Sequence, residues 1–400
     1  MAKSQLVPSI RGKIKTMVMG FEANEPHYIA ILEQLDKKMS KHTEIVIFCR
    51  SKADLRTLQN NNNWKWTKRM KFSGNFLSNL SRWIRDPLLA INKNGQLSEI
   101  IELNSQAGIA NYLIQGLAEH ISMQISAPEK NATILNVGWF EADGGNILVD
   151  QNFILIGWND FQKIMIALYQ KNRCINIPTC YRTTKQEILN VFNQGTSTYT
   201  EVIIIGEPPR LPLGTSKKNY LMHKHRLKLF TTDLWRTTKN SELQLRELMH
   251  LDLFLSLTGQ MYQNKPVVFL AYAVPVKPSL IKRAVDINNQ LRRVQRQLET
   301  RFHIMRNLIP VVENSNHEEY TCFYNNCLVE VTDSSNKVWI PSFGTGIEEW
   351  KKELESFDSL NMDLWKQLGF EAYLIESDFH NLCENGRGAL HCITNEMIRF

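Results

Sequence analysis

One order of predicted elements recurs along this chain of 400 residues. Two apolar runs flank a short turn signal, a helical stretch follows, and a further apolar run completes the unit. Units of this kind begin near Leu88, Asn146, His250 and Cys322. Because such a unit cannot close its own sheet, neighbouring units have to bury their sheet edges against one another. The recurrence therefore predicts an α/β fold of repeated modules whose loops converge at one end.

The periodicity and the turn residues also predict the elements of these modules. An Asn-Gly pair at 94–95 predicts a hairpin within 88–103. A turn is expected near Gly259, and apolar residues at steps of three and four predict one long helix from Ser279 to about Leu308, with its arginines facing solvent. Further strands are expected at 13–20, 43–49, 201–206, 267–274, 338–342 and 370–375, and further helices at 26–40, 51–58, 160–171 and 347–357.

Composition narrows the class of protein. With 43% hydrophobic and 22% charged residues, the chain has the balance of an ordinary globular protein. Its longest nearly uncharged apolar run, Pro266 to Val276, is shorter than the roughly 20 residues that cross a bilayer. The segment Met1 to Pro8 lacks the apolar core of a secretory signal. We therefore expect no membrane association, and a protein that is cytoplasmic or exported without a conventional signal peptide.

The cysteines and the charge carry two further expectations. Seven cysteines, an odd number without Cys-x-x-Cys spacing, indicate reduced thiols. The formal net charge of +7 is concentrated in the basic segments 210–228 and 292–301. Because neither segment interleaves aromatic residues with its basic ones, we interpret both as solvated faces and expect no nucleic-acid partner.

Cys392 is the first candidate for chemistry. It directly follows His391 and a segment punctuated by Gly386 and Gly388. A lone cysteine is most often a buried apolar filler. As a nucleophile it needs a nearby cation, because a thiol with a pKa of about 8.5 is mostly protonated at neutral pH. A protonated histidine or a cationic substrate would supply that charge.

Polar residues in three other segments complete the candidate set. His250 and Asp252 form a His-x-Asp pair, and two residues so spaced share a face when the backbone is extended but diverge in a helix. Asp86 follows Arg85, and its carboxylate has the shape to accept two parallel N–H bonds from a planar guanidinium. The alternative for Asp86 is a surface pair with Arg85 that contributes little energy.

Four motifs in a fixed order carry a family resemblance. They are Trp83-x-Arg85-Asp86, Asp143-Gly144-Gly145-Asn146, His250-Leu251-Asp252 and Gly388-x-x-His391-Cys392. Together they resemble the guanidino-group-modifying enzymes, the pentein or amidinotransferase-like superfamily. In motif detail they are most similar to agmatine deiminases and bacterial peptidylarginine deiminases. The resemblance covers about residues 80–400, and 1–80 is a less clearly matched module. It implies one catalytic domain over 1–400, folded as a five-module ββαβ propeller with a central active site.

The resemblance also implies roles for individual residues. Cys392 would be the nucleophile and His250 the general acid and base. Asp252 and Asp143 would be further catalytic carboxylates, with Glu141 as the alternative to Asp143. The residues implied to bind the substrate are Asp86, Trp83, Arg85 and Asn326. No metal and no cofactor are implied, and the partner is a small molecule or a protein that carries a guanidino group.

The reaction implied is hydrolysis of a guanidino group through a covalent thiouronium, with release of ammonia and a ureido product. Free arginine, agmatine, methylated arginine and protein arginine all stay open as substrates. Amidino transfer to an amine uses the same attacking residues and is the first alternative. A thiol protease or acyltransferase built from Cys392, His250 and Asn326 is the second, although it leaves the extra carboxylates unexplained. A non-catalytic module that captures arginine side chains is the third.

Overall fold

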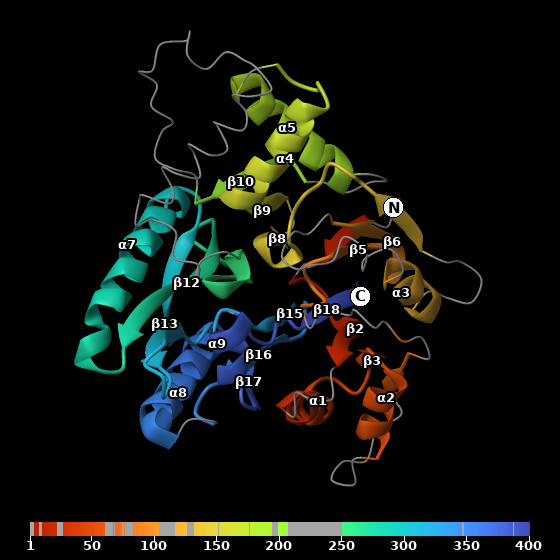
Figure 1. Ribbon diagram of the computed structural model, residues 1–400. Coiled ribbons are helices and arrows are strands. Elements are labelled where there is room, and N and C mark those ends of the chain that lie inside the picture. The colour runs from red at the N-terminus through yellow and green to blue at the C-terminus, as the bar shows by residue number, and fades with distance from the viewer. Residues whose placement is uncertain are drawn as a thin grey trace.

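A computed structural model describes most of the chain, and the basic segment 210–228 lies outside the described residues. The described residues are 4–7, 10–21, 27–60, 67, 69–73, 76, 83–93, 95–103, 117–125, 132–150, 152–175, 177–193, 199–206, 250–345, 348–386 and 388–400. They form five sheets, with helices toward the periphery (Figure 1). The fold is therefore mixed α/β, as the recurring pattern predicts.

The strands of the described residues fall into short sheets. They are β1 (Ser4–Val7), β2 (Ile14–Phe21), β3 (Glu44–Cys49), β4 (Met70–Phe72), β5 (Leu88–Lys93), β6 (Gln96–Glu102), β7 (Thr133–Asn136), β8 (Ile147–Asp150), β9 (Phe153–Gly157), β10 (Glu201–Ile205), β11 (Leu255–Tyr262), β12 (Lys265–Pro275), β13 (His303–Glu313), β14 (Glu319–Thr321), β15 (Leu328–Val331), β16 (Asn336–Ser342), β17 (Glu371–Glu376) and β18 (Thr394–Arg399). The α-helices are α1 (His27–Lys38), α2 (Lys52–Gln59), α3 (Leu117–Ile125), α4 (Trp158–Gln170), α5 (Ile177–Phe192), α7 (Ile281–Leu298), α8 (Lys351–Gln367) and α9 (His380–Gly386).

Each sheet contains the same order of strand pairings. An antiparallel pair comes first, a helix follows, and the next strand returns parallel to the second strand of the pair. The pairs β5–β6, β8–β9, β11–β12 and β15–β16 are antiparallel, and β7, β10, β13 and β17 then add in parallel. The hairpins expected within 88–103 and 146–157 are therefore confirmed.

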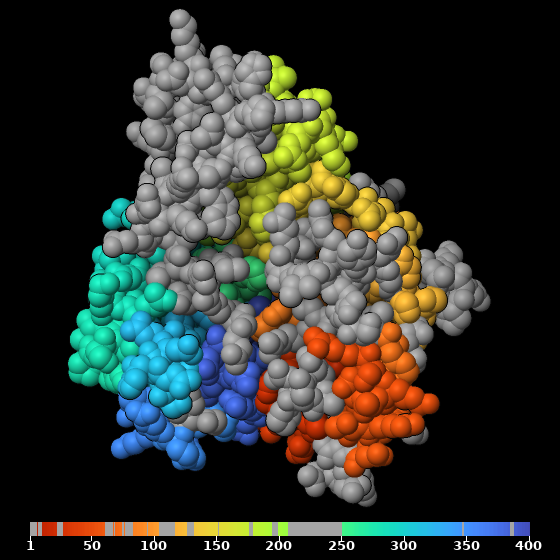
Figure 2. Space-filling model, in the orientation of Figure 1, coloured from red at the N-terminus to blue at the C-terminus, as the bar shows by residue number. Residues whose placement is uncertain are grey.

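The fifth sheet joins the two ends of the chain. Its strand order is β18-β2-β3-β4, in which β18 is antiparallel to β2 and β2 is parallel to β3. Figure 2 shows the blue C-terminal segments beside the red N-terminal ones. Strand β1, which precedes β2 in the chain, does not join this sheet but pairs with β5 of another one. The pairing of β18 with β2 places Cys392, just before β18, close to the first strands of the chain.

Helix α7 packs as its sequence predicts. The buried residues include Ile287, Leu291 and Val294, whereas Arg292 and Arg293 are exposed. The helix is shorter than expected, because it ends at Leu298 and the chain re-enters the sheet as β13. Nine residues of β13 pair with β12, and this pairing overrides the helical spacing of the apolar residues after 298.

Two further expectations are wrong. The turn between β11 and β12 lies at Gln263 and Asn264, both with positive φ, whereas Gly259 (φ +66) lies at an irregularity of the β11–β12 register. Cys174 and Cys180 form a disulfide, so the thiols are not all reduced. Cys174 lies between α4 and α5, whereas Cys180 lies in the first turn of α5, and their Cα atoms are 5.0 Å apart. Among the described residues, no helix combines the length and apolar character of a membrane span.

Candidate active site

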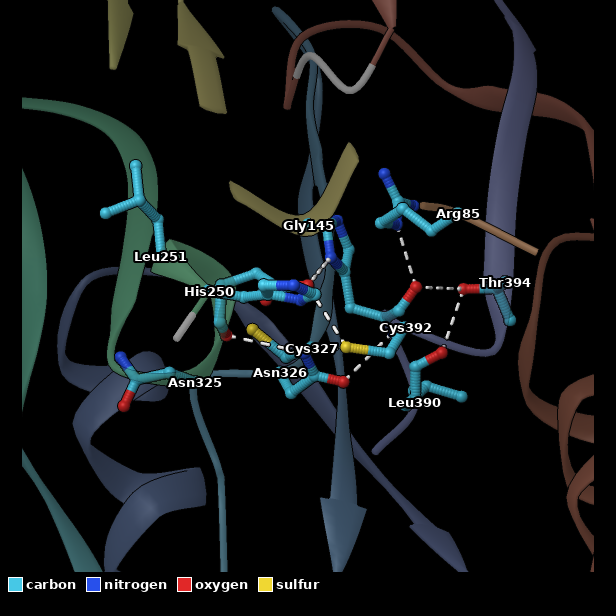
Figure 3. A network of polar contacts seen from close by, with 12 residues as sticks. Arg85, Gly145, His250, Leu251, Asn325, Asn326, Cys327, Leu390, Cys392 and Thr394 are labelled. Carbon is cyan, nitrogen blue, oxygen red and sulfur yellow. Dashed lines mark hydrogen bonds and ion pairs between the residues drawn. The ribbon is translucent and has the colours of Figure 1, made fainter. Parts of the chain in front are cut away.

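Cys392 lies in a tight turn between α9 and β18, and only 3% of its surface is exposed. The Thr394 hydroxyl donates to the carbonyl of Leu390 at 2.9 Å and closes the turn around the cysteine. Figure 3 shows the sulfur pointing toward the ring of His250, which is within hydrogen-bond reach. Residues about 140 positions apart thus meet at one sulfur atom, since the Cys392 thiol also donates to Asp252 Oδ2 at 3.4 Å.

His250 lies between two carboxylates. Its Nδ1 is 3.8 Å from Asp86 Oδ1, and its Nε2 is 3.5 Å from Asp143 Oδ2. Burial by itself lowers the pKa of His250, but the nearby Asp86 and Asp143 outweigh it and hold that pKa well above the ordinary value. The two carboxylates therefore favour the protonated imidazole.

Asp252 belongs to the 3-10 turn η3 (Leu251–Leu253), which begins directly after His250. Its Oδ2 lies 2.7 Å from His391 Nδ1. Burial raises the pKa of Asp252, but the hydrogen bond from His391 and the charge of His250 bring it below the ordinary value. Oδ1 of Asp252 is buried without a hydrogen-bond partner among the described residues. This carboxylate therefore has an unused acceptor inside the site.

Asp86 faces the site from the segment that precedes β5. The amide of Gly145 donates to its Oδ1 at 3.4 Å, and the amide of Gly144 donates to its backbone carbonyl at 3.0 Å. Burial raises the pKa of Asp86 to about 7, with Asp143 and Asp252 adding to the rise and His250 opposing it. Two like charges at close range explain why a cation is needed to hold this carboxyl ionised.

The structure separates the two acidic candidates of the 141–146 segment. Asp143 is the residue beside His250, and Asp160 accepts from its backbone amide at 2.9 Å. Glu141 is partly exposed and interacts mainly with the charges of Lys163 and Asp160. Geometry thus favours Asp143 over Glu141 as the carboxylate of the site.

Asn146 links the two backbone segments of the site. Its Oδ1 accepts from the amide of Leu251 at 3.2 Å, and its Nδ2 donates to Asp160 at 3.0 Å. Asn146 follows Asp143 in the turn η1 (Gly144–Asn146), and Leu251 follows His250. A single amide side chain therefore sets the distance between the Asp143 and His250 segments.

Two glycines leave space that side chains would fill. A Cβ at Gly145 would lie 3.0 Å from both Asp252 Oδ2 and His250 Nδ1. A Cβ at Gly388 would lie 2.6 Å from the ring of Trp83 and 3.0 Å from the Cβ of Cys392. Trp83 therefore packs against the Cys392 turn at Gly388, and Gly145 keeps the space between the histidine and the carboxylates open.

Two residues expected to bind the substrate contact the Cys392 turn. Arg85 is fully buried, donates from Nε to the carbonyl of His391 at 2.8 Å and forms an ion pair with Glu396, as Figure 3 shows in part. The positive charge of Arg85 is therefore paired with groups of the Cys392 turn and of β18. Asn326 is also fully buried and uses its amide on the same turn. Both residues therefore support the Cys392 turn, and their contact with a substrate stays a prediction.

Burial raises the pKa of the Cys392 thiol to about 12, and the charge of Asp252 adds to the rise while the hydrogen bond from His250 opposes it. These surroundings thus favour the neutral form of the thiol and the cationic form of the imidazole, beside clustered carboxyls. A planar cation placed among these carboxyls would stabilise both the carboxylates and the thiolate.

The same cluster has the donor types of a transition-metal site. One ligand atom each from His250, Asp252 and Cys392 lies within 4.8 Å of the other two. Imidazole, carboxylate and thiolate are the ligands that Zn²⁺ takes in proteins. These residues are therefore the ones that would hold a metal ion in this site.

Comparisons with known proteins find similarity in the fold alone. A scan against protein-family models finds no match, and a search of curated proteins finds none. Solved structures do match. C. jejuni agmatine deiminase superimposes with a TM-score of 0.59 at 11% identity, covering 98% of this chain and 96% of that one. The agmatine deiminase of Enterococcus faecalis gives 0.55 at 12% identity, over 100% and 96%.

The chain has the fold of these agmatine deiminases. A cysteine-to-serine variant of the C. jejuni enzyme with substrate bound matches too, with a TM-score of 0.57 at 10% identity over 99% and 98% of the two chains. The resemblance drawn from the four motifs is thus confirmed at the level of the mixed α/β fold, and the match spans nearly the whole chain.

Sequence reasoning missed several residues that support the site. His391 contacts Asp252, Asp160 holds the amide of Asp143, and Glu396 neutralises Arg85. The sequence gives no clear signal for Glu396, because its strand mixes polar residues with Met397 and Ile398. Its burial shows the need for a cationic partner, since a buried carboxylate is costly without one.

Proposed function

We propose that this protein is a cysteine-dependent hydrolase of the guanidino group, a deiminase. The observation that carries the proposal is the convergence of Cys392, His250, Asp86 and Asp252 from three distant segments on one buried space. A thiol, a histidine and two carboxylates suit a flat cation whose central carbon is to be attacked. The names of the matched structures, agmatine deiminases, agree with this chemistry.

We further infer that the five sheets are the modules of one closed propeller and that 1–400 is one catalytic domain. The shared ββαβ pairing and the sheet that joins β18 to β2 support this inference. A closed ring disposes of exposed strand edges and brings the loops at one end together. This arrangement accounts for the meeting of segments as distant as Asp86 and Cys392.

The carboxylates act first. Asp86 accepts N–H bonds from the guanidinium, and Oδ1 of Asp252 supplies the acceptor that has no partner among the described residues. The bound positive charge stabilises the thiolate, so the thiol proton of Cys392 leaves to solvent. The Cys392 sulfur then forms a bond to the central carbon, and the electrons of the C–N double bond move onto nitrogen.

His250 then completes the first half-reaction. Its imidazolium gives a proton to the departing nitrogen, the C–N bond breaks, and ammonia leaves. A thiouronium remains on Cys392. Neutral His250 next takes a proton from water, the oxygen bonds to the carbon, and the C–S bond breaks. Loss of the remaining hydroxyl proton yields the ureido product, so that guanidinium and water become ureido product and ammonium.

The proposal covers arginine, agmatine and protein arginine as substrates, because each presents the same head group. Amidino transfer shares the first half-reaction and differs only in the acceptor of the amidino carbon. A thiol protease would leave the pair Asp86 and Asp143 beside His250 without a role, so the geometry favours guanidino chemistry over peptide cleavage.

The test is turnover of arginine, agmatine, methylated arginines and an arginine-containing protein, scored by ureido product and ammonia. Cys392→Ala should abolish turnover. Cys49→Ala, at another buried free thiol in β3, is the matched control and should keep it. Turnover that survives Cys392→Ala would overturn the nucleophile. Peptide-bond cleavage would point to the protease, and amine-dependent product without ammonia to amidino transfer.

A further inference from the structure

Asn326 makes more contacts to the turn of the proposed nucleophile than to any other part of the site. Its Oδ1 accepts from the backbone amides of Ala389 and Cys392, at 2.9 and 3.1 Å. Its backbone carbonyl accepts from the amide of His391 at 3.2 Å. Asn326 lies on the short segment between β14 and β15 and is fully buried. One side chain from a different sheet thus holds the turn that presents the thiol.

These contacts also determine which way the amide points. Backbone N–H groups only donate, so the amide oxygen has to face Ala389 and Cys392. The NH₂ group is then directed at the other side, where Nδ2 lies 3.1 Å from Cys392 Sγ and 3.5 Å from the carbonyl of Asp252. The donor at the sulfur is therefore a consequence of the backbone contacts and does not rest on an arbitrary choice of amide orientation.

We propose that Asn326 is a catalytic residue whose amide stabilises the Cys392 thiolate. The inference rests on the proposed function, in which Cys392 is the nucleophile. A hydrogen bond to the sulfur favours the thiolate over the neutral thiol. The Asn326 amide is a neutral donor held in place by its backbone contacts, so it favours the thiolate both before and after the substrate binds. It differs in this respect from the imidazole of His250, which loses its proton during turnover.

The surroundings of the sulfur show why such a donor is needed. The charged groups that face Cys392 are Asp252, His250 and Asp86. Asp252 and Asp86 oppose the thiolate and His250 favours it. His250 gives its proton to the leaving group and takes one from water later, whereas the Asn326 amide keeps its N–H donor at the sulfur throughout turnover. In the second half-reaction it therefore stabilises the thiolate that leaves the tetrahedral carbon.

Asn326→Asp separates the two tasks of this side chain. One carboxylate oxygen keeps the acceptor for the two backbone amides, while the other replaces the donor with a negative charge at the sulfur. We expect alkylation of Cys392 by iodoacetamide, followed by peptide mass spectrometry, to slow at least tenfold at every pH below the thiol pKa. With guanidino substrate, kcat should fall at least tenfold while KM changes less than threefold, because the amide donates to the sulfur.

Asn325→Ala is the matched control. Asn325 is the neighbouring buried amide, and it donates to Ser256 and to the carbonyl of Phe269. Its loss should destabilise the fold without changing the alkylation rate of Cys392. Asn326→Ser is the second variant if Asn326→Asp does not fold, and thermal unfolding establishes that each variant is folded at the assay temperature.

Unchanged alkylation rates in folded Asn326→Asp or Asn326→Ser would overturn the proposal, as would a rise in KM without a fall in kcat. The alkylation rate requires no substrate, so this result can be obtained even if wild-type protein forms no ureido product. The absence of ureido product from wild-type protein would contradict the proposed function alone and would not decide the role of Asn326. A tenfold loss of Cys392 reactivity with normal reactivity at Cys49 supports the role of Asn326 at the sulfur.

Discussion

Nδ1 of His391 lies 2.7 Å from Oδ2 of Asp252, and both residues are buried beside the Cys392 sulfur. Burial and the charge of Arg85 lower the pKa of His391, so its ring is neutral and donates a hydrogen bond to the carboxylate. This bond occupies Oδ2 and leaves Oδ1 as the acceptor without a partner among the described residues. His391, the residue before the proposed nucleophile, therefore orients the carboxylate of Asp252, which lies about 140 positions earlier in the chain.

His391→Ala should raise KM for the guanidino substrate about tenfold with a smaller change in kcat, because Asp252 loses the donor that orients it. His391→Asn keeps an N–H donor at nearly the same place and should restore most of the binding. Steady-state kinetics of both variants test the pair. Equal defects in the two variants would show that the ring contributes volume and not its hydrogen bond.

The pH dependence should follow Asp86. Because its pKa stands at about 7, the carboxyl is protonated below that pH and loses the charge that holds a cation. We expect kcat/KM to fall about tenfold per pH unit below pH 7 and to level above it. Asp86 and His250 titrate as a pair, so the measured value belongs to both.

The matched variant is Asp86→Asn, which is neutral at every pH. Its residual kcat/KM should be low and nearly flat between pH 5 and 8. An acid limb in this variant identical to that of wild type would assign the titration to a different group.

Gly145→Ala should lower kcat/KM at least tenfold. The added Cβ would lie 3.0 Å from Asp252 Oδ2 and from His250 Nδ1, closer than most real Cβ contacts, in the space the substrate head group needs. Gly138→Ala is the control, because its Cβ would meet its nearest atom, Asn136 Oδ1, at an ordinary 3.7 Å. If both variants turn over substrate like wild type, the proposed position of the guanidinium is wrong.

Arg85→Met should destabilise the fold by about 3 kcal/mol in chemical denaturation, because Glu396 would lose the main partner of a buried charge and keep only Arg399. Lys366→Ala removes the exposed pair with Asp363, whose partners are 50% and 61% exposed, and should change stability by less than about 0.5 kcal/mol. Similar effects in the two variants would argue that Arg85 is not held by Glu396 in solution.

Zinc should inhibit the proposed turnover. His250, Asp252 and Cys392 offer imidazole, carboxylate and thiolate within 4.8 Å of one another, and a Zn²⁺ ion there would occupy the place of the substrate cation. Chelator should restore activity, and chelator alone should leave it unchanged, because no proposed step uses a metal. Mg²⁺ prefers oxygen ligands and is the control. Loss of activity on chelation alone would contradict the metal-free mechanism.

Local pattern was enough to predict much of the fold. The alternation and turn residues of 88–103 and 146–157 specify hairpins, and Ser51 caps α2 by accepting from the amide of Asp54. The residues at which helices and strands end could be predicted less well from the sequence. Helix α7 stops at Leu298 because the next residues pair with β12, and a helical spacing cannot anticipate a partner strand.

By itself, the sequence determined the module order and the types of reactive side chain, including Cys392, His250 and Asp252, since these depend on short-range spacing and on motifs. The tertiary structure decided what each of them faces. It placed Arg85 and Asn326, expected to bind the substrate, against the Cys392 turn, and it distinguished Asp143 from Glu141. The physical reason is that burial, hydrogen-bond partners and pKa depend on atoms brought together from distant segments, and no local pattern specifies those atoms.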